Sequence, residues 1–182
     1  MILVHGSRML TDRSVRRAVR FGFAHVCREG NVAEAKRYGE VYKLDLTDMR
    51  HQSCYAFYLA CMAGHLDMAQ WLAKTLKMTY SDATKHDNFI FRRVCGHGYL
   101  QLAQWLVAHF GMESPKLRTG GNEAFNMACV NGHSHVVTWL VKIAELDPVR
   151  DRFDVIIENC YLANQEAMAV WLQSLLFSRR NA

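Results

Sequence analysis

The sequence of 182 residues lacks any apolar run that approaches the ~20 residues needed to span a bilayer. Its opening apolar stretch, Met1 to Val4, is far shorter than the ~7–15-residue apolar region of a secretory signal. Only 21% of the residues are charged and 51% are hydrophobic, so the chain can bury a core and is not disordered. We therefore expect no membrane partner and an intracellular location, cytoplasmic or nuclear.

Sequence motifs of the common enzyme classes are also missing. The chain has no His-Glu-x-x-His or Gly-x-Ser-x-Gly motif, and the glycine pair at 120–121 lacks the Lys and Ser or Thr of a phosphate-binding loop. Asp147 and Asp151 read as isolated charges in a polar connector, and His65 and His133 as structural residues of Gly-His turns. Because no nucleophile–base pair can be nominated, we expect a protein that is not an enzyme and that binds no cofactor or metal.

The six cysteines could form disulfide bonds or a zinc site only if their side chains met, and their spacing argues against both. Equivalent positions on packed helices lie about 8–10 Å apart. A disulfide needs Cα atoms within about 7 Å, and zinc needs each sulfur at about 2.3 Å. We therefore predict buried free thiols, which pack as small hydrophobes, at four positions in one register: Cys27, Cys61, Cys95 and Cys129.

What the chain does contain is a repeat. Trp71, Trp105 and Trp139 are equally spaced along the chain, and Trp171 follows after a slightly shorter step. The spacing of the first three tryptophans also links the four cysteines and two further sets: Gly30, Gly64, Gly98 and Gly132, and Phe23, Phe57, Phe91 and Phe125. A period of this length, about 34 positions, is typical of stacked helical repeats. The sequence therefore predicts an all-α solenoid.

Each unit reads as two short helices joined at the repeated glycine. In the clearest unit, Phe57, Ala60 and Cys61 lie at i, i+3 and i+4 and form one face of a first helix. Gly64 ends that helix, because glycine adopts the left-handed conformation of many C-terminal caps, and a second helix follows. Helices that are apolar on one side must stack, so we expect a buried phenylalanine ladder and tryptophans packed in the core.

Residues 59–66 (Leu-Ala-Cys-Met-Ala-Gly-His-Leu) and 127–133 (Met-Ala-Cys-Val-Asn-Gly-His) resemble the inter-helix core of ankyrin repeats. The Ala-Cys form with a later Trp-Leu is similar to the ankyrin arrays of large DNA viruses and some protists. The register itself gives about five units, and the resemblance implies a role as an adaptor or an inhibitor of a host protein. In ankyrin repeats the first helix normally opens with Thr-Pro-Leu-His, and this motif is missing here. The hydrogen bonds that its Thr and His make between repeats would therefore have to come from other residues. The tetratricopeptide repeat shares the period but needs an early Trp and a Pro ending each unit, whereas prolines occur here only at 115 and 148.

The register predicts a single domain with short flanking ends. We expect units near residues 14–47, 48–81, 82–115, 116–149 and 150–176, an N-terminal extension over 1–13 and a tail over 177–182. The outer units depart from the pattern, since Arg37 and Tyr38 replace the Trp-Leu pair in the first and Asn164 replaces the turn glycine in the last. Atypical outer units are expected of the caps of a repeat array.

A basic register marks the connectors, where the resemblance places the protruding fingers of the ankyrin binding surface. It comprises basic residues and the histidines beside them: Arg16, Arg50, His51, Lys85, His86, Arg118 and Arg152. We expect the ends of the first helices to add an exposed floor: Met62, Ala63, Gly96, His97, Val130 and Asn131. With a formal charge of +5, this surface predicts a monomeric module that binds another protein with an acidic edge. The alternative is nucleic-acid binding through the same basic ridge, which would be strongly salt-dependent.

Overall fold

The computed structural model describes residues 13–44 and 53–180, without the side chains of residues 13, 53–54, 85–87 and 180. Every regular element within these ranges is an α-helix, which confirms the all-α class. None of the described helices is long and apolar enough to cross a membrane. The helices form two compact units, with the boundary between Met78 and Thr79.

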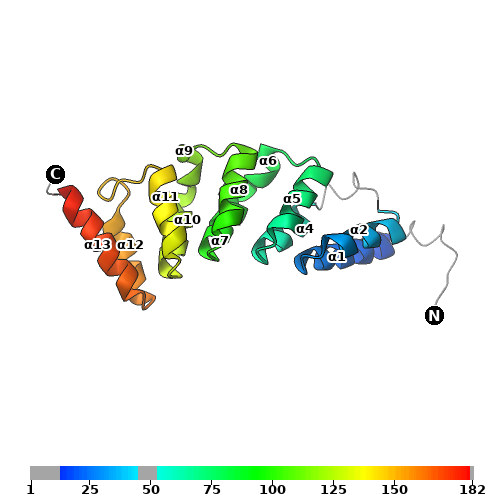
Figure 1. The fold of residues 1–182 in the computed structure, drawn as a ribbon, viewed down its shortest axis with the longest axis horizontal. Helices are drawn as coiled ribbons and strands as arrows, with labels where there is room; N and C mark the ends of the chain where they lie inside the picture. Colours follow the sequence, from blue (N-terminus) through cyan, green and yellow to red (C-terminus); the bar gives the residue numbers. More distant parts are fainter. Residues whose placement is uncertain (1–12, 45–52, 181–182) are drawn as a thin grey trace. The chain divides into compact units, whose positions relative to one another are not determined.

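Unit 1 consists of two helix pairs (Figure 1). The first pair is α1 (Arg13–Arg28) with α2 (Val32–Val41), and the second is α4 (Ser53–Met62) with α5 (Leu66–Thr75). Helix α1 packs against both α2 and α4, and α2 also contacts α5. The chain reverses within each pair at a predicted glycine, since φ is 80° at Gly30 and 79° at Gly64.

Unit 2 contains three helix pairs and two short connecting helices in its described part (Figure 1). Helix α10 packs against both α7 and α12, so the first helices of successive pairs are neighbours. The short helices lie in the connectors and were not expected from the sequence pattern. In chain order the elements are α6 (Tyr80–Ala83), α7 (Lys85–Gly96), α8 (Leu100–Phe110), α9 (Ser114–Leu117), α10 (Thr119–Val130), α11 (Ser134–Ile143), α12 (Phe153–Leu162) and α13 (Glu166–Arg180).

The structure defines two helix boundaries in unit 2. Helix α13 continues to Arg180, so residues 177–180 of the expected tail are helical. Three successive residues at the start of α10, Gly120 to Asn122, have left-handed φ values of 66°, 67° and 64°. The regular part of α10 therefore begins at Glu123.

The core of each unit is built from the repeated phenylalanines and cysteines. All four phenylalanines of the register are at most 2% exposed, and all four cysteines are fully buried free thiols, as predicted. Burial raises the pKa of the Cys27 thiol to about 12. Because the thiolate is the reactive form of cysteine, this side chain serves packing and not chemistry.

The tryptophans lie at the edge of the core. All four are half-buried and not fully enclosed, which corrects the expectation that they pack inside. The ring centroid of Trp71 is 6.3 Å from that of Phe23, and the centroid of Trp139 is 6.4 Å from that of Phe91. Each contact joins the second helix of one pair to the first helix of the preceding pair. The indoles therefore cover the buried phenylalanines from solvent.

The Gly-His turns interlock between neighbouring pairs. A Cβ atom at Gly30 would lie 2.5 Å from the ring of His65, and one at Gly98 would lie 2.6 Å from the ring of His133. Each histidine thus fills the space that a side chain on the preceding turn would need. This contact explains why glycine and histidine recur together in the sequence.

Candidate interaction surface

The predicted basic residues lie at the starts of the first helices wherever the structure describes those connectors. Arg118 directly precedes α10 and is half-buried, and Arg152 directly precedes α12 and is exposed. Arg16 instead lies within α1, because that helix begins at residue 13. The other predicted residues have no described side chain, with Lys85 and His86 at the start of α7 and Arg50 and His51 outside the described ranges.

Arg152 is paired within the chain. Its Nε donates a hydrogen bond to Asp154 Oδ1 at 3.0 Å, and its Nη2 donates to Asp154 Oδ2 at 3.2 Å. These hydrogen bonds lower the pKa of Asp154 and raise that of Arg152. The connector before α12 therefore presents an ion pair and little net charge.

The predicted floor at the helix ends is only partly exposed. His97 and Asn131 are exposed at the ends of α7 and α10, whereas Met62 at the end of α4 is half-buried. Gly96 is buried, because the side chain of Met127 lies over it, 3.0 Å from where a Cβ atom would be. The Asn131 amide donates a hydrogen bond to the Gly96 carbonyl at 2.7 Å. The floor is thus partly a structural contact between α7 and α10.

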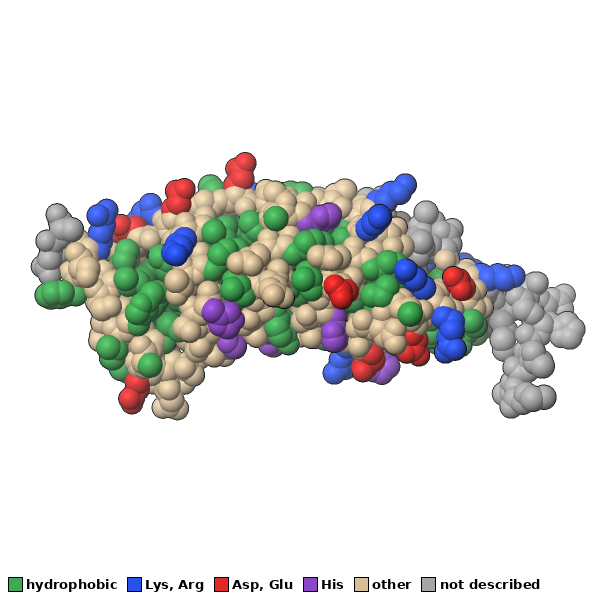
Figure 2. Space-filling model, in the orientation of Figure 1, with side chains coloured by type: hydrophobic (Ala, Val, Ile, Leu, Met, Phe, Trp, Pro, Cys, Tyr) green, Lys and Arg blue, Asp and Glu red, His purple; other side chains and the backbone are tan. Residues whose placement is uncertain are grey.

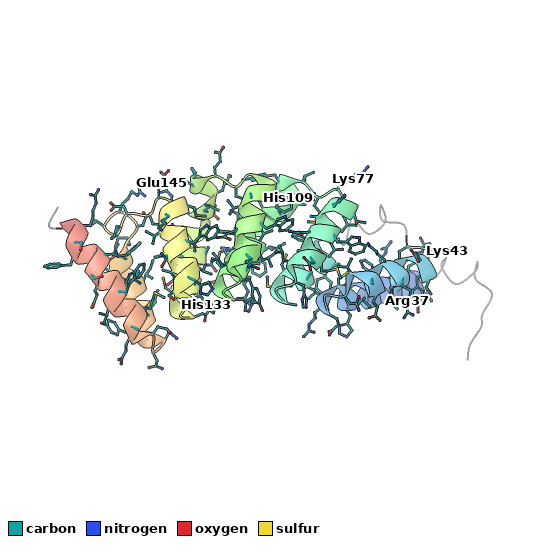
Figure 3. All side chains as sticks on the ribbon, in the orientation of Figure 1. Arg37, Lys43, Lys77, His109, His133 and Glu145 are labelled. Atoms are coloured by element: carbon teal, nitrogen blue, oxygen red, sulfur yellow. The ribbon has the colours of Figure 1, made fainter. Side chains whose placement is uncertain are left out.

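The floor and the basic residues of unit 2 lie at opposite ends of its helices. The regular part of α10, residues 123–130, spans about 12 Å, with Arg118 before it and Asn131 after it. Figure 3 shows the two ends of the next helix, α11, with His133 at one end and Glu145 beyond the other. The two predicted groups therefore do not converge on one site.

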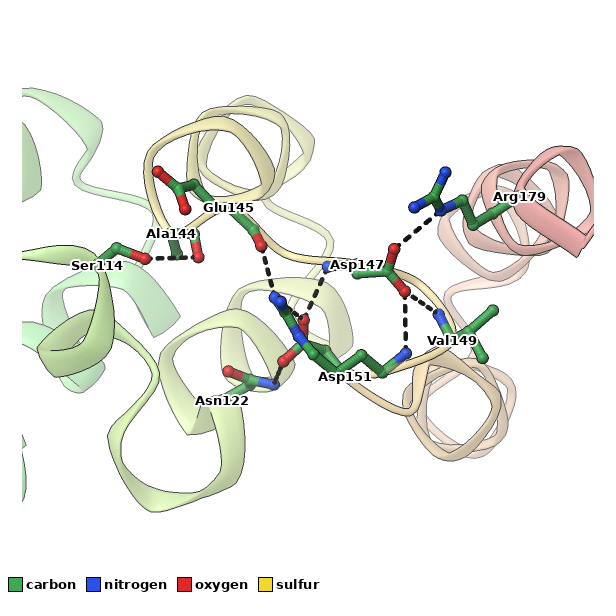
Figure 4. Close-up of polar contacts among 9 residues, drawn as sticks. Ser114, Asn122, Ala144, Glu145, Asp147, Val149, Asp151 and Arg179 are labelled. Atoms are coloured by element: carbon green, nitrogen blue, oxygen red, sulfur yellow. Dashed lines mark hydrogen bonds and ion pairs between the residues drawn. The ribbon is translucent and has the colours of Figure 1, made fainter. Parts of the chain in front are cut away.

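The two aspartates that read as isolated charges are in fact the centre of a hydrogen-bonded connector (Figure 4). Asp151 accepts hydrogen bonds from the Asp147 amide at 2.7 Å and from Arg150 Nη2 at 2.9 Å. Asn122 Nδ2 donates a third at 3.2 Å. Asp147 in turn accepts two backbone hydrogen bonds at 3.0 Å and one from Arg179 Nε at 2.9 Å. These contacts tie α13 and the start of α10 to the connector.

These contacts also set the ionisation of both carboxyl groups. The hydrogen bond from the Arg150 amide, followed by that from Arg179, lowers the pKa of Asp147. Burial raises the pKa of Asp151, but its hydrogen bonds together outweigh burial and leave the pKa below its usual value. Both carboxylates are therefore ionised at neutral pH and engaged in structural contacts. Among the described residues, no group of three or more His, Cys, Asp or Glu is placed to hold a metal ion.

Two buried asparagines link neighbouring helix pairs in unit 2. Asn88 and Asn122 occupy equivalent positions of successive repeats, have φ values of 60° and 64°, and are 1% and 8% exposed. Asn88 Nδ2 donates to the Lys116 carbonyl at 2.6 Å, and Asn122 bonds the connector carboxylate of Asp151. Asparagine tolerates left-handed backbone better than other side chains do. These residues supply inter-pair hydrogen bonds that the sequence analysis left without a source.

Exposed aromatic residues form a register that the sequence analysis missed. Phe21, Tyr55 and Phe89 are spaced by one repeat period and are 50%, 46% and 36% exposed. Each lies two residues before a buried phenylalanine of the core register. The same periodic spacing could have revealed them, but only the structure shows that their rings reach the surface. Large exposed rings at repeated positions are candidates for partner contacts.

In both units, guanidinium groups accompany these rings. In unit 1, Arg17 Cζ lies 5.6 Å from the centroid of Phe21, and the Phe21 and Tyr55 centroids are 6.1 Å apart with an edge-to-face angle of 79°. Tyr58 continues the cluster, 6.3 Å from Tyr55. In unit 2, two guanidinium groups lie 5.9 and 5.8 Å from the Phe89 centroid. We call the cluster of Arg17, Phe21, Tyr55 and Tyr58 the arginine–aromatic face of unit 1.

The positive charge of the chain is concentrated in unit 1. Residues 13–44 and 53–78 contain ten Lys or Arg and four Asp or Glu, a formal charge of +6. Residues 79–180 contain ten of each and are formally neutral. Figure 2 shows Lys and Arg side chains beside hydrophobic ones on the visible face of unit 1, at the right of the view. The net positive charge of the chain therefore lies in the N-terminal unit.

A hollow of about 270 Å³ in unit 2 offers no acid–base chemistry. It lies beside α11 and α13 and is lined by Gly132, Ser134, Thr138, Gln165, Ala167, Met168 and Trp171. None of these side chains titrates. Close by, burial lowers the pKa of His133, against the opposing effect of its hydrogen bond to the Gly96 carbonyl, so this histidine is a neutral structural residue at physiological pH.

Comparison with known proteins identifies no relative: no family model, no curated protein and no solved structure matches this chain.

Proposed function

We propose that this protein is a non-enzymatic protein-interaction module, built as an ankyrin-type solenoid of about five units. Two features support this architecture. Each repeat period contains a pair of helices, and the histidine of one turn packs against the glycine of the preceding turn. A repeat array of this kind binds through side chains that recur along its surface. Function should therefore be sought on a face and not in a cleft.

The observation that carries the proposal is the set of exposed aromatic rings with adjacent arginines on the first helices. Aromatic residues and arginine are enriched at protein interfaces and among the residues that contribute most to affinity. We expect the module to act inside a cell, cytoplasmic or nuclear. By the resemblance to viral ankyrin arrays, we expect it to act as an adaptor or an inhibitor of a host protein.

Affinity purification of the whole protein from a eukaryotic lysate, followed by mass spectrometry, tests the proposal. One variant reverses Arg50, Lys85 and Arg118 to Glu, and because Arg118 is half-buried, circular dichroism verifies that the helices persist. Partner capture should fall and should weaken with added salt, since charges mainly steer association. A second variant replaces the floor residues Met62, His97 and Asn131 by Ala. If the first variant binds the partner fully and the second does not bind it, the partner contacts the floor and not the basic residues.

Nucleic-acid binding is the second candidate, favoured by the charge excess of unit 1. Affinity would then fall linearly with the logarithm of salt concentration, with a slope set by the number of phosphates contacted. Titration of duplex and single-stranded DNA over a salt series measures that slope. If nucleic acid is retained from the lysate and no discrete protein is, the protein-interaction proposal is wrong.

A further inference from the structure

The charged residues at the start of helix α1 have the opposite sign from those that usually stabilise a helix N-terminus. It carries five arginines and no acidic residue, and Arg16, Arg17 and Arg20 fall in its N-terminal half. The N-terminal end of a helix has a partial positive charge and favours carboxylates. Arginines spaced three and four residues apart also repel one another. Residues that break a local rule in this way often serve a binding function.

The aromatic rings beside these arginines are exposed and contact one another. Phe21 is 50% and Tyr55 is 46% exposed. Arg17 lies over the ring of Phe21, and the rings of Phe21 and Tyr55 meet edge to face. Side chains that already contact one another have less conformational entropy to lose on binding. The face therefore offers clustered apolar rings bordered by positive charge.

We infer that the arginine–aromatic face of unit 1 binds an acidic segment of a protein partner in which carboxylates alternate with apolar side chains. This inference rests on the proposed function and specifies where the partner binds and what its chemistry is. Carboxylates match the planar donor fork of arginine and offset the positive end of α1. Apolar side chains of the segment would cover Phe21 and Tyr55.

The ring geometry favours such a segment over single-stranded nucleic acid. Bases bind aromatic side chains by stacking on an open ring face. Here Arg17 lies over the Phe21 ring, and Phe21 and Tyr55 meet edge to face with an interplanar angle of 79°. Tyr55 and Tyr58 are nearly parallel, with an interplanar angle of 26°. The ring faces that bases would need are thus partly occupied by other side chains, whereas aliphatic side chains can contact a ring in any orientation.

Binding of three fluorescent probes to the full-length protein, measured by anisotropy, tests this inference. The first is a peptide of alternating glutamate and leucine, the second a peptide of equal length and charge with serine for leucine, and the third a single-stranded oligothymidylate. We expect the leucine peptide to bind about tenfold more tightly than the serine peptide, because only the former buries apolar surface. Added salt should weaken the binding of both peptides.

Two substitutions in the face have matched controls elsewhere. Arg17→Ser is compared with Arg37→Ser, an exposed arginine on α2 of the same unit, and Tyr55→Ser with Tyr80→Ser, an exposed tyrosine on α6. We expect each change in the face to weaken the leucine peptide about fivefold or more, and each control to change it less than about twofold. Circular dichroism of each variant verifies that the helices persist.

Three results would overturn the inference. Equal affinity for the two peptides would show that charge alone attracts them. Tighter binding of the oligothymidylate, lost on Tyr55→Ser, would show a base-stacking surface. The proposed function is judged separately: a protein partner whose capture from lysate is unchanged by Arg17→Ser and Tyr55→Ser would leave it standing while overturning this assignment.

Discussion

Replacing Phe91 by alanine should lower the free energy of unfolding by about 3–5 kcal/mol. Phe91 lies in α7, is completely buried, and has its ring centroid 6.4 Å from that of Trp139. The substitution removes the whole ring from between helices that are held at their turns and connectors, so the cavity can close only in part. A typical domain has a total stability of about 5–15 kcal/mol, so the loss would be a large fraction of it.

Phe89 provides the control, because it lies two residues earlier in the same helix and is 36% exposed. Its ring contacts are to two guanidinium groups at 5.9 and 5.8 Å. Contacts of this kind at exposed sites contribute about 0.5–1 kcal/mol each, so Phe89→Ala should cost about 1–2 kcal/mol. The two variants make the same chemical change in the same helix and differ mainly in the burial of the ring that is removed.

Urea denaturation followed by far-UV circular dichroism measures both losses. The urea concentration at the unfolding midpoint should fall strongly for Phe91→Ala and slightly for Phe89→Ala. The dependence of the unfolding free energy on urea concentration should stay constant if the same surface is exposed on unfolding. Equal losses for the two variants would refute the assignment of Phe91 to the core and Phe89 to the surface. A smaller loss of stability for Phe91→Ala than for Phe89→Ala would place Phe89 in the core and Phe91 at the surface.

Lowering the pH below about 4 should destabilise the chain, because the folded pKa values of Asp147 and Asp151 lie below their usual values. Their contribution is present above the unfolded pKa and is lost as the pH falls through the folded pKa. The melting temperature of Asp151→Asn should therefore depend less on acid than that of the wild type. Asn88→Ala should cost about 2 kcal/mol, and more than Asn88→Gly, because both lose the hydrogen bonds but only alanine strains a φ of 60°; urea denaturation compares the two. A fragment of residues 48–149 should aggregate, since removing the outer units exposes the apolar faces of inner ones. A monodisperse, folded fragment in size-exclusion chromatography would contradict this.

The candidate surface was predictable only in part. The basic register was assigned to the connectors, and in the structure Arg118 and Arg152 directly precede α10 and α12. It could not show that Asp154 pairs with Arg152, or that the first helix begins early enough to include Arg16. The exposed aromatic register was visible in the spacing, but the buried phenylalanines two residues away gave the stronger signal.

By itself the sequence determined the helix pairs, their glycine turns and the residues of the core. A constant period puts equivalent residues on the same helix face, so burial repeats along the chain: Phe57 and Phe91 are both 0% exposed. Helix α4 ends at Met62, two residues before the predicted Gly64. These features depend on local pattern, in which each residue's environment follows from its neighbours three and four positions away.

Tertiary structure alone decided the contacts between residues that are distant in sequence. Arg179 and Asp147 are 32 residues apart, and Asn88 and Lys116 are 28 apart. Periodicity carries no information about such hydrogen-bond partners, because they depend on how connectors and helix ends meet. The same holds for Phe21 and the core phenylalanine that follows it in α1. Both positions are equally hydrophobic, and only the packing of α1 against α2 and α4 buries one ring and leaves Phe21 at the surface.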